Sequence, residues 1–271
     1  MKKFFLRIAF VLCIAGILPF NVSAAETDTL IESYDDVCIT GFLSGAPEQK
    51  LHAQFVSGKD YTYESALILP ASADTDTVRI WVSMENIDKE NGTKELVPLS
   101  GYVTIDGKQV HSGDEISLPK DNGTLSVSTG NGKRETIRVR KSANLASMFI
   151  QTASGTMDAI HADKEYKEKG DMLLIRADGT VDYNSTLKSI KGRGNATWEY
   201  DKRPYNIKLD TSSDLLGMGK AKGWCLLANY LDTSLLRNKM IYKLAEETGV
   251  PFTMDSKSVD LYLNGSYNGT Y

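Results

Sequence analysis

A short polar loop with two glycines holds the residues whose types and spacing could do chemistry. It lies in the run Ile190–Trp198, and its candidate ligand contacts are Gly192, Arg193, Gly194, Asn195 and Thr197. Because glycine has no Cβ, the backbone N–H groups of such a loop can approach an anion closely. Lys208 follows on the next apolar stretch, and its ammonium group can add a point charge against the same anion. The pattern predicts a phosphate-bearing ligand, first of all a nucleotide.

The charge around this loop favours an anionic ligand. Between Lys188 and Lys243 eleven basic residues stand against five acidic ones, in a chain whose formal net charge is −4. A concentrated positive field attracts a phosphate group. The alternative is a solvated face whose countercharges come from elsewhere in the fold. The overall charge gives no case for nucleic-acid binding.

The glycine spacing excludes two common phosphate-binding motifs. No Lys-Ser/Thr pair closes the loop, as a Walker motif needs, and no helix follows at once, as in a dinucleotide fold. A glycine hairpin followed by a strand lysine is the protein-kinase type of arrangement. A helix expected over Asp232–Gly249 places Arg237 and Asn238 near its start, where they could face the ligand. The partner of Lys208 stays unassigned.

That helix is the strongest expectation from periodicity. Leu236, Met240 and Leu244 recur every four residues, and Asp232 or Thr233 can cap the start. After it, an alternating strand runs into Asn264-Gly265, a strong hairpin signal, and the sequence stops soon afterwards. We expect that a substantial part of the domain lies downstream.

The N-terminal part predicts a different architecture. Short alternating strands separated by turns fill the region up to Lys141, with hairpin signals at Asp106-Gly107 and around Asn131-Gly132. They favour a β-sandwich of immunoglobulin-like shape over residues 26–142. Residues 145–271 would then form a truncated kinase-like lobe, an antiparallel sheet with one main helix. The predicted fold class is therefore α+β.

The first residues predict export. Lys2, Lys3 and Arg7 precede an apolar run, Ile8–Phe20, and small residues allow a cut after Ala24 or Ala25. We expect residues 1–24 to be a signal peptide and the protein to be secreted, extracellular or at the cell surface, without a membrane span after cleavage. An uncleaved anchor is the alternative.

The two cysteines beyond this segment, Cys38 and Cys225, are far apart and fall in the two different predicted domains. Free thiols are therefore favoured over one disulfide.

Several motifs in succession resemble the CotH kinase family, the spore-coat-protein-H type of atypical secreted kinase, over about Leu145–Tyr271. They are Ile190–Trp198, Lys202–Leu209, Leu216–Lys220, Trp224–Tyr230, Leu235–Lys239 and Val259–Gly265. The resemblance implies ATP, Mg²⁺ or Mn²⁺, and phosphorylation of Ser or Thr on a coat or extracellular protein. It implies that Gly192–Asn195 cover the phosphates, that Lys208 is the strand lysine, and that Arg237 and Asn238 lie beside the nucleotide.

The resemblance also carries a departure. The family's catalytic and metal-binding aspartates belong to a later half, so we expect the metal ligands beyond the C-terminal end and no transfer activity from these 271 residues. The alternative hypothesis is a non-catalytic extracellular or spore-coat module with a structural or adhesive role. A carbohydrate-associated protein is a third reading, against which the β-rich part shows no aromatic cluster.

Overall fold

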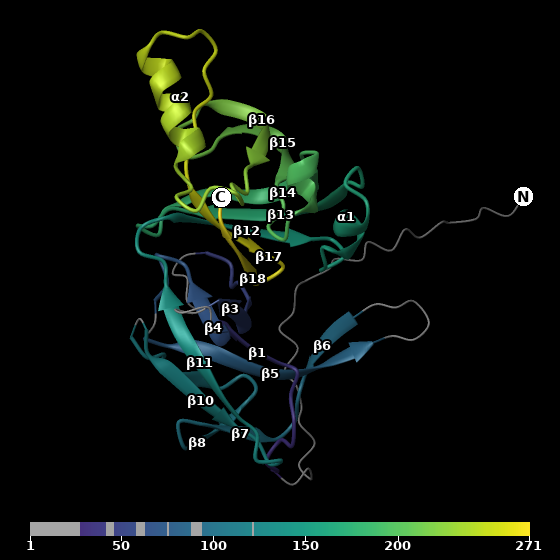
Figure 1. Ribbon diagram of the computed structural model, residues 1–271. Helices are drawn as coiled ribbons and strands as arrows, with labels where there is room; N and C mark the ends of the chain where they lie inside the picture. The colour runs from purple at the N-terminus through teal and green to yellow at the C-terminus, as the bar shows by residue number, and fades with distance from the viewer. Residues whose placement is uncertain (1–27, 42–45, 58–62, 75, 88–93, 121) are drawn as a thin grey trace, which may run out of the picture.

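The computed structural model describes residues 28–41, 46–57, 63–74, 76–87, 94–120 and 122–271, so the expected signal peptide lies outside the described residues (Figure 1). The protein is mostly β, with 48% strand and 9% helix, and its strands form three curled sheets. Within the described ranges, no helix has the length and apolarity needed to cross a membrane.

Two sheets make up the N-terminal part. The first has the order β2-β1-β5-β6, with β9 paired to β5, and the second runs β3-β4-β11-β10-β7-β8. The strands of the first sheet are β1 (Asp36–Thr40), β2 (Leu51–His52), β5 (Val78–Ile87), β6 (Lys94–Pro98) and β9 (Glu115–Ile116). Those of the second are β3 (Gln54–Ser57), β4 (Tyr63–Leu69), β7 (Tyr102–Ile105), β8 (Lys108–His111), β10 (Thr124–Ser128) and β11 (Arg134–Lys141).

The predicted hairpins in this part are confirmed. Asp106-Gly107 joins β7 to β8, and both residues have positive φ, +48° and +79°, as a primed turn requires. A second hairpin joins β10 to β11 around Asn131-Gly132. The two sheets enclose one apolar core, in which alternate residues such as Ile39, Leu67 and Ile137 are fully buried. An immunoglobulin-like shape for this sandwich stays a prediction.

The third sheet carries the C-terminal part, in the order β16-β15-β14-β13-β12-β17-β18. Its strands are β12 (Ala146–Thr152), β13 (Glu168–Ile175), β14 (Val181–Gly192), β15 (Tyr205–Asp214), β16 (Lys220–Leu226), β17 (Val259–Leu263) and β18 (Ser266–Thr270). The Asn264-Gly265 hairpin forms as expected between β17 and β18. The central strands of the third sheet are apolar on both faces because each face of the sheet meets a hydrophobic core.

The two faces of these central strands serve two different cores. Phe149, Leu173 and Tyr262 point toward the sandwich and join its core, where the Phe149 and Tyr262 rings stack 4.7 Å apart. Ile150, Leu174 and their neighbours point the other way into a second core. The short helix α1 (Asp158–Ala162) and the 3₁₀ helix η2 (Ala196–Glu199) cover it with Ile160 and Trp198.

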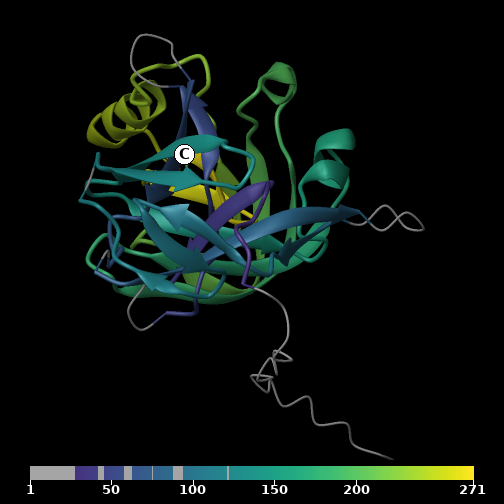
Figure 2. The same ribbon diagram turned by 90° about the horizontal axis from the view of Figure 1, so that it is seen from below.

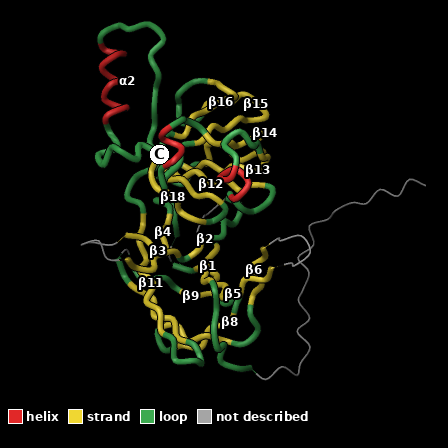
Figure 3. Tube along the Cα trace, turned by 45° about the vertical axis from the view of Figure 1, so that its right-hand side comes forward, coloured by secondary structure: helices red, strands yellow, loops and turns green. Residues whose placement is uncertain are grey.

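The predicted α+β fold class is wrong, because the structure is mostly β and little of it is helical. The expected helix forms as α2 (Arg237–Glu247), but none of its residues is buried. It stands away from the strands, on the opposite side of the molecule from α1 (Figures 1 and 2), and little else in the described part of the chain is helical (Figure 3). An α+β kinase-like lobe built on a main helix is therefore replaced by a mostly β structure. Periodicity fixes the conformation of a segment but not what covers its apolar side.

Candidate functional site

The glycine loop closes the end of β14 in one tightly packed shape. Gly194 has φ +87°, and a Cβ there would lie 2.1 Å from Oγ1 of Thr197. At Gly192 a Cβ would lie 2.6 Å from the Trp198 ring. The ammonium of Lys164 donates a hydrogen bond to the Gly194 carbonyl (2.9 Å). Both glycines are therefore required by close packing, and the loop is held rather than slack.

The segment before α2 is built with backbone strain. Asn229 and Leu235 have positive φ, +49° and +56°, although both carry a Cβ. Asp232 organises the segment, because its carboxylate accepts hydrogen bonds from the Ser234 side chain (2.6 Å) and from the backbone N–H of Arg237 (2.8 Å). These bonds, led by the one from Ser234, lower the pKa of Asp232. Such strain is found at binding and catalytic sites more than elsewhere.

The loop and the start of α2 meet at a cavity of about 300 Å³. Arg193 and Thr197 line it from the loop, and Arg237 and Asn238 line it from the first turn of α2. The Asn238 amide is oriented by a hydrogen bond to Oδ1 of Asn229 (2.8 Å). Among the described residues the Arg193 guanidinium has no ion-pair partner. The cavity thus gathers two guanidinium groups, an amide and a hydroxyl from segments about forty residues apart.

Two tyrosines add an aromatic wall to the same cavity. The rings of Tyr200 and Tyr230 stack with centroids 5.0 Å apart and an interplanar angle of 14°. The Tyr230 hydroxyl donates to the Asp201 carboxylate at 3.4 Å. Sequence reasoning missed this pair, because nothing in the spacing of thirty residues indicates that the two rings meet.

The remaining predicted site residues lie around the cavity or away from it. Gly192 and Gly194 shape the loop, and the Asn195 carbonyl accepts the first hydrogen bond of η2 from Trp198. Lys208 is exposed on β15, opposite Ser189 and Gly223, and does not line the cavity. Cys38 and Cys225 are free, as the sequence favoured.

The donors of the cavity fit a phosphate group but not a metal ion. Guanidinium groups bind phosphate oxygens in pairs of hydrogen bonds. The carboxylate at the cavity, Asp232, already has both oxygens engaged by Ser234 and Arg237. Within the described part of the chain, no group of three or more His, Cys, Asp or Glu residues could hold a metal ion.

Comparison with known proteins bears on this part of the chain. A family model described as CotH kinase protein matches residues 190–271, a shorter stretch than the resemblance from the sequence had suggested. No curated protein and no solved structure matches the chain. Residues 190–271, which contain the glycine loop, the cavity and α2, are therefore the part of the chain that is similar to the CotH kinase family.

Proposed function

We propose that the Arg193 cavity binds the phosphate chain of ATP, as part of a CotH-type kinase. One observation carries the proposal: Arg193 and Thr197 of the glycine loop share a cavity with Arg237 and Asn238 of α2. The cavity holds two guanidinium groups and two neutral donors against one carboxylate, that of Asp232, which lies 3.7 Å from the Arg237 guanidinium. The remaining positive charge and the donors match the several oxygens of a polyphosphate. The family match over the same residues supports a kinase-like role.

The stacked tyrosines suggest where the rest of the nucleotide lies. Tyr200 and Tyr230 line the same cavity as the two arginines. Aromatic rings stack readily on a nucleobase and tolerate different bases. The proposal therefore places the adenine against this aromatic wall and the phosphates against the guanidinium groups.

The reaction proposed is transfer of the γ-phosphoryl group of ATP to a Ser or Thr hydroxyl of a coat or other extracellular protein. The hydroxyl oxygen forms the new bond to phosphorus, ADP leaves, and the hydroxyl proton is released. The chemistry that Mg²⁺ or Mn²⁺ would supply when bound is neutralisation of the charge on the phosphate groups. The residues described here would hold the phosphates, while the groups that bind the metal and orient the hydroxyl stay unassigned. A secreted location follows from the expected signal peptide and belongs to the same proposal.

Nucleotide binding tests the proposal without depending on catalysis. Titration of the chain with ATP, with and without Mg²⁺, is expected to saturate, and Arg193→Ala is expected to weaken binding by about 1.5–3 kcal/mol because a charge-assisted hydrogen bond is lost. Lys108→Ala, an exposed lysine on β8, is the charge-matched control and leaves the affinity unchanged. Lys208→Ala tests the strand lysine that the family pattern suggests. It weakens ATP binding if Lys208 contacts the phosphates, and it leaves the affinity unchanged if the cavity residues alone hold them. Absence of ATP binding, or equal affinity in wild type and Arg193→Ala, would refute the cavity.

A non-catalytic coat or adhesion module is the second candidate function. The exposed apolar surface of α2 favours it, because such a surface indicates contact with another protein. ATP binding that responds to Arg193→Ala argues against a purely structural role. Failure to bind ATP, together with protein association through α2, would favour the module.

A further inference from the structure

The segment 230–254 concentrates exposed apolar side chains to a degree unmatched in the other described residues. The exposed large apolar residues within it are Tyr230, Leu231, Leu236, Met240, Ile241, Leu244, Val250, Phe252 and Met254. The exposed fractions of Met240 and Leu244 are 66% and 55%. An isolated helix of eleven residues is marginal in water, so its apolar stripe needs a covering surface. Such a patch on a soluble domain marks an interaction site.

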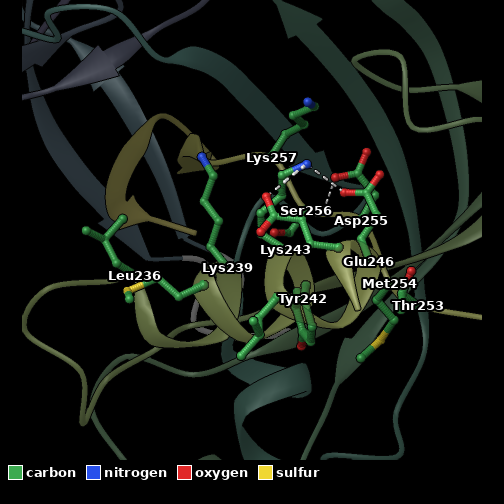
Figure 4. Close-up of a pocket in the computed structure, with 13 residues that line it drawn as sticks. Leu236, Lys239, Tyr242, Lys243, Glu246, Thr253, Met254, Asp255, Ser256 and Lys257 are labelled. Atoms are coloured by element: carbon green, nitrogen blue, oxygen red, sulfur yellow. Dashed lines mark hydrogen bonds and ion pairs between the residues drawn. The ribbon is translucent and has the colours of Figure 1, made fainter. Parts of the chain in front are cut away.

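A groove runs beside this stripe. One flank of α2 and the returning segment 253–257 enclose about 860 Å³ (Figure 4). Lys239, Lys243 and Glu246 lie along the flank, and Asp255 and Lys257 lie across from them. The groove is therefore apolar at its helix side, where Met240 and Leu244 contribute, and charged at its rim.

The charges of the flank are ordered along the helix. Its first two turns are basic, with Lys239 and Lys243, and its last turn is acidic, with Glu246 and Glu247. Two copies of α2 placed antiparallel, with Met240 of one copy against Leu244 of the other, bring the basic half of each helix beside the acidic half of the other. In this arrangement Lys239 of one copy comes within reach of Glu247 of the other, twice. A twofold interface of this kind is self-complementary in charge and in apolar surface.

We propose that α2 is a self-association surface, and that its occupant is α2 of a second copy of this chain. A membrane surface is disfavoured because the flank is balanced in charge, with carboxylates beside the lysines, whereas anionic lipid favours a basic flank. Lys239 has no ion-pair partner among the described residues, so its ammonium is available to the second copy. Lys243 contacts Glu246 (3.0 Å) and, more loosely, Glu247 (3.9 Å) within its own helix, so Lys239 of the second copy would share the exposed Glu247 carboxylate with it. The inference does not depend on nucleotide binding.

Charge exchange between copies gives a test that a merely unstable variant cannot imitate. Sedimentation of the purified chain over a range of concentrations is expected to show a reversible monomer–dimer equilibrium. Lys239→Glu alone and Glu247→Lys alone each place like charges together across the twofold axis, and each is expected to weaken the dimer by on the order of tenfold or more. An equimolar mixture of the two variants restores opposite charges at both contacts, so it is expected to recover the wild-type dimer constant.

Two further variants complete the design. Met240→Lys is expected to leave a folded monomer, with circular dichroism showing an unchanged strand content, and Lys188→Glu, an exposed lysine on β14, is expected to dimerise as wild type does. The proposal is overturned if wild type stays monomeric at high concentration. It is also overturned if the mixed variants fail to recover the dimer, or if association persists in Met240→Lys. Binding to vesicles of anionic phospholipid by a monomeric wild type would identify a membrane as the occupant instead.

Discussion

At the scale of single residues, the sequence singled out the two glycines of the loop, but it did not reveal the structural reason why they are required. The sequence indicated glycines because a phosphate needs close approach to the backbone. In the structure both glycines are first of all required by neighbours in the protein, since Trp198 and Thr197 occupy the space that a Cβ would take. Close packing and close approach of a ligand both require a residue without a Cβ at these positions, so the sequence alone does not distinguish the two causes.

Replacing Gly194 tests the packing requirement directly. Gly194→Ala is expected to lower the free energy of unfolding by about 1–3 kcal/mol, because alanine at φ +87° is strained and its Cβ meets Oγ1 of Thr197. Gly223→Ala is the control, since its φ is not in the left-handed region and no atom lies within 4 Å of the added Cβ. Urea denaturation measures both. Equal stabilities for the two variants would contradict the strained geometry.

A histidine of the sandwich gives the molecule a pH-dependent stability. His111 lies between Asp28 (2.9 Å) and Asp114 (3.2 Å), and these carboxylates, Asp28 first, raise its pKa above 6.5. Because the pKa is higher in the folded than in the unfolded state, protonation of His111 stabilises the fold. This contribution is complete at pH values below the ordinary pKa and is lost as the pH rises through the raised pKa. We expect wild type to lose more stability than His111→Gln between pH 6.5 and pH 8.5. Parallel denaturant midpoints for the two proteins over that range would count against this ion-pair network.

At the scale of elements, α2 separates what periodicity decides from what it leaves open. The four-residue recurrence of Leu236, Met240 and Leu244 predicted the helix, and the structure has it, several residues shorter at its start. The shortening has a local cause, because Asp232 folds the preceding segment into a turn of its own with Ser234 instead of beginning the helix. The same carboxylate still satisfies the backbone N–H of Arg237, the first residue of α2.

Asp232 and Thr233 were the two candidates to cap this helix, and neither is its N-cap, because the helix begins later and Leu236 holds that position. The Asp232 carboxylate instead reaches the helix from the preceding turn and accepts the Arg237 N–H. Asp232→Ala is expected to speed amide hydrogen exchange several-fold through the first turn of α2, because the Arg237 N–H loses its acceptor. Thr233→Ala is expected to leave exchange unchanged, since among the described residues its side chain has no hydrogen-bond partner. Mass spectrometry after brief exchange measures the difference. Identical rates in both variants would show that the turn holds without Asp232.

At the scale of the whole molecule, the sandwich and the third sheet share a core. Tyr262 of β17 is 1% exposed, stacks on Phe149, and donates a hydrogen bond through its hydroxyl to the Ile68 carbonyl of β4. Side chains of the first two sheets and of the third sheet form one apolar cluster. The sequence suggested two parts, residues 26–142 and residues 145–271, and their side chains pack together in this shared core.

This coupling predicts cooperative unfolding. Tyr262→Ala is expected to cost about 3–5 kcal/mol, because a buried aromatic ring is removed from the shared core. The same loss of unfolding free energy should be measured from the fluorescence of Trp81, which reports on the sandwich, and from that of Trp198, which reports on the other core. Tyr262→Phe keeps the ring and is expected to cost about 1 kcal/mol through its lost hydrogen bond. Separate transitions for the two tryptophans in the wild-type protein would mean that the parts unfold independently.

The sequence by itself determined the local features of this protein. It determined the hairpins at Asp106-Gly107 and Asn264-Gly265, because these residues adopt the positive φ that a tight turn needs, and it determined the existence of α2 through its periodicity. It also indicated the glycine loop, Arg237 and Asn238. Tertiary structure alone decided the rest: the pairing of β12 with β17, the meeting of Tyr200 with Tyr230, the position of Lys208 away from the cavity, and the exposure of α2. The physical reason is that local conformation follows from nearby residues, whereas the choice of covering surface is made between segments far apart in the chain.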